Sequence, residues 1–113
     1  MADGETRLYP IDTRNLEPGM TRAFEIQGIS LLVCNVGGDL FALENRCSHA
    51  GARFDAGRLR EHRLECPLHG ALFDVRSGKP LQAPARRNVR VFPVEADRDA
   101  VRVALPQGQG DPP

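Results

Sequence analysis

Short runs of alternating apolar and polar residues, separated by turn-forming residues, recur along the chain. The most apolar run is Ile29–Val36, which predicts a central strand. Gly37-Gly38-Asp39 then predicts a hairpin turn, and Leu40–Glu44 is the expected return strand. The other expected strands are Leu8–Ile11, Thr21–Ile26, Gly57–Leu59, Arg63–Glu65, Ala71–Val75, Val89–Val94 and Ala100–Leu105, the last two forming a final hairpin.

About nine short strands with turn signals at close spacing predict an all-β fold, either a sandwich or a barrel. A length of 113 residues indicates one domain, 1–113. Pro10 places the first strand at a sheet edge, because proline has no N–H to donate to a neighbour. Residues 12–20 are expected to form a turn with room for one helical turn, residues 80–84 an irregular segment, and residues 107–113 a disordered Gly/Pro-rich tail.

Two short segments each offer one thiol and one imidazole. The first segment is Cys47-Ser48-His49, and the second is Cys66-Pro67-Leu68-His69. Sixteen residues separate His49 from Cys66. Two cysteines and two histidines make a four-ligand metal site, and their chemistry leaves two main candidates: a structural zinc, or a two-iron cluster with cysteine on one iron and histidine on the other. A zinc finger pairs Cys with Cys and His with His, whereas each segment here is mixed.

This spacing, with Gly51 and Gly70 following the two histidines, resembles the Rieske [2Fe-2S] family. His69–Asp74 is similar to the second ligand loop of that family, and Ala83–Ala85 is similar to its proline loop. From Arg7 to Leu105 the chain resembles the small Rieske ferredoxins of bacterial aromatic-ring-hydroxylating dioxygenases. The resemblance implies an antiparallel β sandwich or incomplete barrel as a base, with an inserted cluster-binding subdomain at about residues 45–86.

The resemblance also implies the ligands of one [2Fe-2S] cluster. Cys47 and Cys66 would bind the inner iron as thiolates, and His49 and His69 the outer iron as neutral imidazoles. Such an oxidised cluster is neutral, whereas four thiolates would leave it at minus two. An electron is added more easily to the neutral cluster, so its potential lies above the approximately −400 mV of plant-type ferredoxins.

Five further residues are expected around the cluster. Gly51 and Gly70 would let backbone amides approach the sulfurs, and Pro84 would cover the cluster, although each also fits an ordinary loop. High-potential relatives have a serine and a tyrosine that donate hydrogen bonds to sulfur, and Ala71 and Phe73 occupy those places here. Neither can donate, so we expect a potential at the low end of the Rieske range of approximately −150 to +300 mV.

High-potential relatives also carry an extra cysteine in each ligand loop, and these two form a disulfide. Ala52 and Leu68 occupy the matching positions, so no such disulfide is expected. The third cysteine, Cys34, lies in the apolar run and is expected to be a buried small hydrophobe. His62 lies in a polar stretch and is expected to be a solvated turn residue.

The resemblance implies a monomeric one-electron carrier between an NAD(P)H-dependent flavoprotein reductase and a terminal oxygenase. It would be a component of an enzyme system, not itself an enzyme, because the chain is too short to add a mononuclear iron domain. The alternatives are a small subunit of a nitrite reductase-like enzyme, whose members typically lack the four ligands, and a zinc-stabilised interaction module without redox function.

Charge and hydropathy narrow the choice of partner and compartment. Formal net charge is zero and no apolar run approaches the roughly 20 residues of a membrane span, so we expect neither nucleic acid nor membrane as a partner. The first residues are polar and acidic, which predicts a cytoplasmic protein without a signal peptide. From Arg46 to Phe92, ten basic and four acidic residues give plus six. Such a basic face would steer docking to an acidic partner, and a solvated surface of mixed charge is the alternative.

Overall fold

The computed structural model describes residues 6–48, 51–54, 57–67, 70–83 and 87–107. These residues contain no helix, so the all-β prediction is confirmed for the described chain. No helix among them could cross a membrane. The described residues form eleven strands: β1 (Thr6–Ile11), β2 (Thr21–Ile26), β3 (Ile29–Val36), β4 (Asp39–Glu44), β5 (Arg58–Arg60), β6 (Arg63–Glu65), β7 (Leu72–Asp74), β8 (Pro80–Gln82), β9 (Val91–Phe92), β10 (Val94–Ala96) and β11 (Val101–Pro106).

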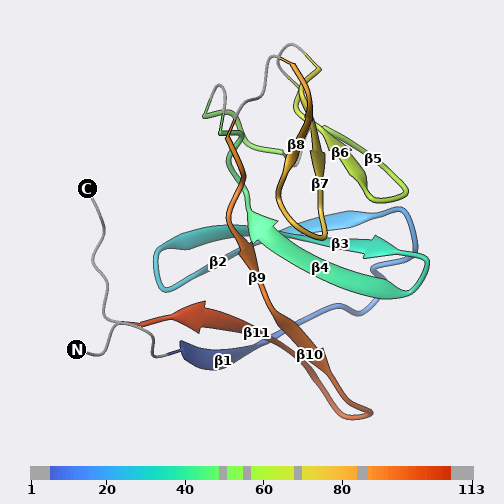
Figure 1. Ribbon diagram of the computed structural model, residues 1–113. Coiled ribbons are helices and arrows are strands. Elements are labelled where there is room, and N and C mark those ends of the chain that lie inside the picture. Colours follow the sequence, from blue (N-terminus) through green and yellow to red (C-terminus); the bar gives the residue numbers. More distant parts are fainter. Residues whose placement is uncertain (1–5, 49–50, 55–56, 68–69, 84–86, 108–113) are drawn as a thin grey trace.

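The strands form three antiparallel sheets, with orders β1-β11-β10, β2-β3-β4-β9 and β5-β6-β7-β8. In Figure 1 the β2-β3-β4-β9 sheet lies in the middle, with β5–β8 above it and β1, β10 and β11 below. We call the two lower sheets the base and the β5–β8 sheet with its adjoining loops the inserted unit. β4 and β9 are neighbours in one sheet, so the chain leaves the base after β4 and returns to it at β9.

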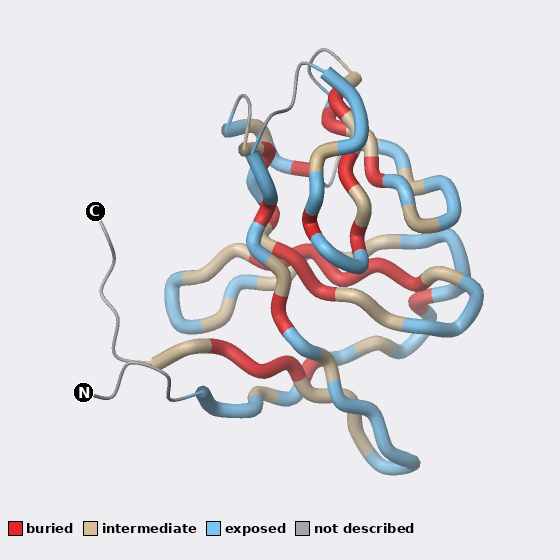
Figure 2. The backbone as a smooth tube through the Cα atoms, viewed as in Figure 1, coloured by how far each residue is buried: buried red, intermediate tan, exposed pale blue. Residues whose placement is uncertain are grey.

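The central strand β3 is apolar along its length because both of its faces are buried. Leu31 and Val33 point into a core cluster shared with β11, whereas Leu32 and Cys34 belong to a second cluster shared with the inserted unit. Successive side chains on a strand point to opposite faces, which explains this division. Figure 2 shows the same pattern as an unbroken buried stretch through the middle sheet.

Tight turns fix the register of the middle sheet. Ile26 pairs with Ile29 across Gln27-Gly28, and Val36 pairs with Asp39 across Gly37-Gly38. All four turn residues have positive φ, between 53° and 103°. Two-residue hairpins with positive φ at both positions follow the natural twist of the strands. The predicted hairpin at Gly37 is therefore confirmed.

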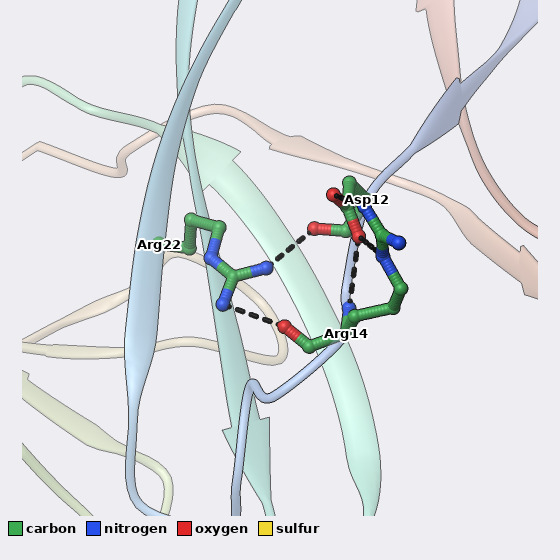
Figure 3. Close-up of polar contacts among 3 residues, drawn as sticks. All are labelled: Asp12, Arg14 and Arg22. Atoms are coloured by element: carbon green, nitrogen blue, oxygen red, sulfur yellow. Dashed lines mark hydrogen bonds and ion pairs between the residues drawn. The ribbon is translucent and has the colours of Figure 1, made fainter.

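The link between β1 and β2 contains no helix, and a cluster of arginines holds it in place (Figure 3). Arg14 Nε and Nη2 each donate to the Asp12 carboxylate at 2.9 Å. This hydrogen-bonded ion pair holds the pKa of Asp12 well below its usual range. From β2, Arg22 donates to the backbone carbonyls of Asp12 and Arg14 at 2.7 and 2.8 Å. Together these hydrogen bonds fix the path of the link beside β2.

Two parts of the strand prediction were wrong, and both involve proline. The expected single strand Val89–Val94 is two strands: β9 pairs with β4, and β10 pairs with β11. Pro93 lies between them, and its carbonyl accepts a hydrogen bond from the Ala104 amide at 2.9 Å. The segment expected to be irregular contains β8, an edge strand that begins at Pro80, where a missing N–H is tolerated. The expected edge position of β1 is confirmed, whereas the predicted disordered tail lies almost wholly outside the described residues.

Candidate metal centre

The two cysteines of the motif open two loops with the same backbone hydrogen bond. The Cys47 amide donates to the Ala52 carbonyl at 2.7 Å, and the Cys66 amide donates to the Ala71 carbonyl at 2.8 Å. Each bond closes a loop onto the residue five positions ahead. Gly51 and Gly70, four positions after each cysteine, have φ of 71° and 68°, a conformation that suits glycine. The described residues of the two ligand segments therefore share the same closing hydrogen bond and the same glycine conformation.

Both thiols are buried in one apolar cluster. Cys47 and Cys66 are each 1% exposed and share this cluster with Phe54 and Phe73. The two phenyl rings pack edge to face, with centroids 5.4 Å apart. None of the three cysteines forms a disulfide. The loops thus bring two thiols from different parts of the chain into one dry environment.

The expected histidine ligands, His49 and His69, lie outside the described residues, as do Leu68 and Pro84. Within the part of the chain that the structure describes, no group of three or more Cys, His, Asp or Glu side chains comes together as a metal site. The four-ligand set and the cover by Pro84 therefore stay predictions.

Ala71 and Phe73 are fully buried in the same cluster as the cysteines. Ala71 also supplies the carbonyl that receives the Cys66 amide. Neither side chain carries a hydrogen-bond donor, so this part of the thiols' surroundings is apolar.

Two anchoring residues escaped sequence reasoning. Asn45 is 2% exposed. Its backbone N–H donates a hydrogen bond to the Ser30 carbonyl of the base at 2.9 Å, and its side-chain Oδ1 accepts one from the backbone N–H of Phe54 in the first loop at 2.6 Å. The hydroxyl of Ser48 donates to the Arg87 carbonyl at 2.6 Å and ties the first loop to the returning chain. A polar residue directly after an apolar strand was the available signal for Asn45, but its partners are known only from the fold.

The sequence assigned no ligand role to two further residues, Cys34 and His62. Cys34 is fully buried, as predicted, and burial raises the pKa of its thiol to about 12, so it stays protonated. His62 lies in the turn between β5 and β6, as expected, but it is half-buried and its ring packs edge to face on Phe41 with centroids 5.6 Å apart. The prediction of a solvated turn residue was therefore right about the turn and incomplete about the packing.

Basic side chains surround the two loops. A cavity of about 520 Å³ adjoins Cys47 and Ser48 and is also lined by Glu44, Arg46 and Arg87. A second cavity of about 280 Å³ adjoins Gly70 and is lined by charged residues of the inserted sheet: Arg58, Arg60, Arg63 and Glu65. The described residues that line these two cavities thus include five arginines and two glutamates.

The described donors fit a mixed Cys/His iron–sulfur cluster. Thiolates of Cys47 and Cys66, presented by equivalent loops, would hold one iron, and the enclosing apolar side chains would limit access of water. Histidines two and three positions after those cysteines would hold the other iron. Cys34, protonated and in a base strand, is not needed as a ligand.

Comparisons with known proteins agree with this reading of the donors. The family model of the Rieske [2Fe-2S] domain matches residues 7–93. The ferredoxin component of biphenyl 2,3-dioxygenase from Rhodococcus jostii (strain RHA1) is 43% identical over 94 residues, covering 83% of this chain and 88% of that protein. The ferredoxin component of the naphthalene 1,2-dioxygenase system from Pseudomonas putida is 38% identical over 80 residues, covering 71% and 77%.

Solved structures show the same fold. The ferredoxin of carbazole 1,9a-dioxygenase from Nocardioides aromaticivorans IC177 has a TM-score of 0.78 and 35% identity, over 83% of this chain and 92% of that one. A chain in a complex of reduced oxygenase and oxidized ferredoxin of carbazole 1,9a-dioxygenase has a TM-score of 0.81 and 32% identity, over 86% and 92%.

Proposed function

Because the chain belongs to the Rieske [2Fe-2S] domain family, and family membership implies one Rieske cluster, we propose that Cys47, His49, Cys66 and His69 are its ligands. The equivalent loops around Cys47 and Cys66 and the burial of both thiols support the assignment. We further propose that Gly51, Gly70, Ala71, Phe73 and Pro84 form the immediate surroundings of the cluster, within a cluster-binding part at about residues 45–86 of a single domain.

We propose that the protein is a one-electron carrier between a flavoprotein reductase and a terminal ring-hydroxylating oxygenase. The observation that carries this proposal is the match to ferredoxin components of dioxygenase systems over most of their length. The solved complex of oxygenase and ferredoxin supports the oxygenase as one partner. The reductase, the monomeric state and the cytoplasmic location are parts of the proposal; three cysteines without a disulfide suit a reducing compartment.

When bound, the cluster takes up and gives back one electron. The protein's own contribution is to hold it and to set its potential. The side chains of Ala71 and Phe73 offer no hydrogen-bond donor to the sulfurs, so the extra electron density of the reduced state is less stabilised. The proposed carrier therefore has a potential at the low end of the approximately −150 to +300 mV range, which suits delivery from a flavin to an oxygenase.

Absorption and electron paramagnetic resonance spectra of the purified protein, before and after dithionite, test the assignment. We expect a red-brown protein whose reduced form gives the rhombic electron paramagnetic resonance signal of a [2Fe-2S] cluster with mixed Cys and His ligands, as the family implies. A redox titration then gives the midpoint, and a value above about 100 mV would contradict the low-potential proposal. A colourless protein with one zinc would replace the electron carrier with a structural module.

A further inference from the structure

The residues directly before the two ligand cysteines carry opposite charges. Arg46 precedes Cys47, and Glu65 precedes Cys66. Since the two loops share the same backbone hydrogen bond and the same glycine conformation, Arg46 and Glu65 occupy equivalent places. The pair is the point at which the two otherwise similar loops differ most in charge.

Each charged group lies over the glycine of its own loop. A Cβ placed on Gly51 would be 3.7 Å from Arg46 Nε and 3.8 Å from Nη2. A Cβ placed on Gly70 would be 3.2 Å from Glu65 Oε2. The guanidinium therefore lies next to the glycine of the first ligand loop and the carboxylate next to the glycine of the second.

Neither group is neutralised by direct pairing. Among the described residues, Arg46 and Glu65 form no ion pair, although Glu44 lines the cavity beside Arg46. Arg58 faces Glu65 across the strand pair, and Arg60 and Arg63 line the same cavity without an ion pair to it. Arg46 is exposed, whereas Glu65 is half-buried. Salt and water therefore screen the carboxylate less than the guanidinium.

We propose that Arg46 and Glu65 set the midpoint potential of the cluster in opposite directions, Arg46 raising it and Glu65 lowering it. Reduction adds one negative charge to the site. A cation lying on one ligand loop stabilises that charge, and a carboxylate on the other destabilises it. Glu65 has the larger effect because it is half-buried, and it adds to the low potential that the missing hydrogen-bond donors already favour.

The test is a redox titration, followed by electron paramagnetic resonance, of five single variants and one double variant. Glu65→Gln raises the equilibrium constant for one-electron reduction about three- to tenfold, which is about 28–59 mV at 59 mV per tenfold. Arg46→Gln lowers it about two- to threefold, about 18–28 mV. The double variant R46Q/E65Q lies between the two. Added salt shrinks the Arg46 shift more than the Glu65 shift.

Matched controls make the same charge changes far from the loops. Glu95→Gln on β10 and Arg98→Gln in the turn before β11 lie at the opposite end of the molecule in Figure 1 and leave the midpoint within error of the parent protein. Shifts of the same sign in E65Q and R46Q, or shifts no larger than those of the controls, would overturn the proposal.

A structural role for the carboxylate is distinguished by Glu65→Asp, which keeps the charge. E65D with a near-parent potential supports the electrostatic effect, whereas E65D with the same shift as E65Q refutes it. Loss of the cluster in E65Q but not in E65D would also refute it, in favour of a carboxylate that is needed to hold the cluster instead of to set its potential. These results are separate from failure of the proposed function, which would show as a parent protein without the iron–sulfur spectrum.

Discussion

The base and the inserted unit are held together by different means. In the base, β3 pairs with β2 and with β4 over six residues each, and its two faces fill two core clusters. In the inserted unit, each of β5–β8 has three residues, and the core includes the two cysteines proposed as ligands. Long ladders and buried leucines give the base its own stability, whereas short strands around buried thiols leave the unit dependent on what the thiols bind.

The largest expected effect comes from removing one thiol of the inserted unit. Cys66→Ala should abolish the visible absorption, because half of the proposed inner-iron ligation is lost. Amide hydrogen exchange should then speed up in β5–β8 while β2–β4 stay protected, since the base does not depend on the cluster.

Cys34→Ala is the matched control for this substitution. Its thiol is equally buried but lies on β3, so the protein should keep its colour. Equal loss of protection in β2–β4 and β5–β8 of C66A would show that the two regions unfold together. That result would contradict the separate stability of the base.

A pair of leucines measures the same division with identical chemistry. Leu31, in the base core, and Leu64, in the inserted core, are both fully buried. Leu31→Ala should lower the free energy of unfolding by about 2–5 kcal/mol, the usual cost of such a cavity, and leave the rate of cluster loss unchanged. Leu64→Ala should lower the free energy less and speed cluster loss. Denaturant unfolding and the decay of visible absorption check both, and the reverse pattern would contradict the division.

Asn45 connects the two regions, because it hydrogen-bonds both Ser30 of the base and Phe54 of the first loop. Asn45→Ala removes the acceptor of the buried Phe54 amide, an effect of about 1–3 kcal/mol on the first loop. Exchange of the Phe54 amide and cluster loss should both accelerate. Asn35 is a buried asparagine of the base with hydrogen bonds to Leu16 and Gly38, so Asn35→Ala should destabilise the base without accelerating cluster loss. If both variants lost the cluster equally fast, Asn45 would have no special role.

How much the sequence could predict does not follow this division: β6 of the inserted unit has its predicted bounds, Arg63–Glu65, whereas the missed break at Pro93 lies in the base. β2 and β3 match the predicted bounds because in the base burial follows the alternation of side chains and the turns are local. Pro93 was a sequence signal against one continuous strand, but that β9 joins β4 and β10 joins β11 is known only from the fold. The short strand β8 has no clear alternation and depends on pairing with β7.

At the centre, spacing alone identified the two cysteines as candidate ligands, and the structure buries both thiols in one cluster. Asn45 could not be found this way, since a buried asparagine is recognised only by partners that are distant in sequence. The sequence did not indicate the importance of Arg46 and Glu65 either. Each precedes a cysteine, but the two positions are recognised as equivalent only once the loops are known to have the same geometry.

The smallest expected effect concerns which end of the molecule meets the partner. Arg87 lines the cavity beside the first loop, is exposed and, among the described residues, forms no ion pair, so it is available to a carboxylate of a docking protein. Arg87→Gln should slow electron delivery to the proposed oxygenase about two- to threefold at low salt, and the difference should vanish at high salt because surface charges are screened. Arg98→Gln is the matched control, because it removes one positive charge between β10 and β11, away from the loops. Stopped-flow reoxidation across a salt series measures both, and an equal slowing by R98Q would show that overall charge, not the loop end, governs the encounter.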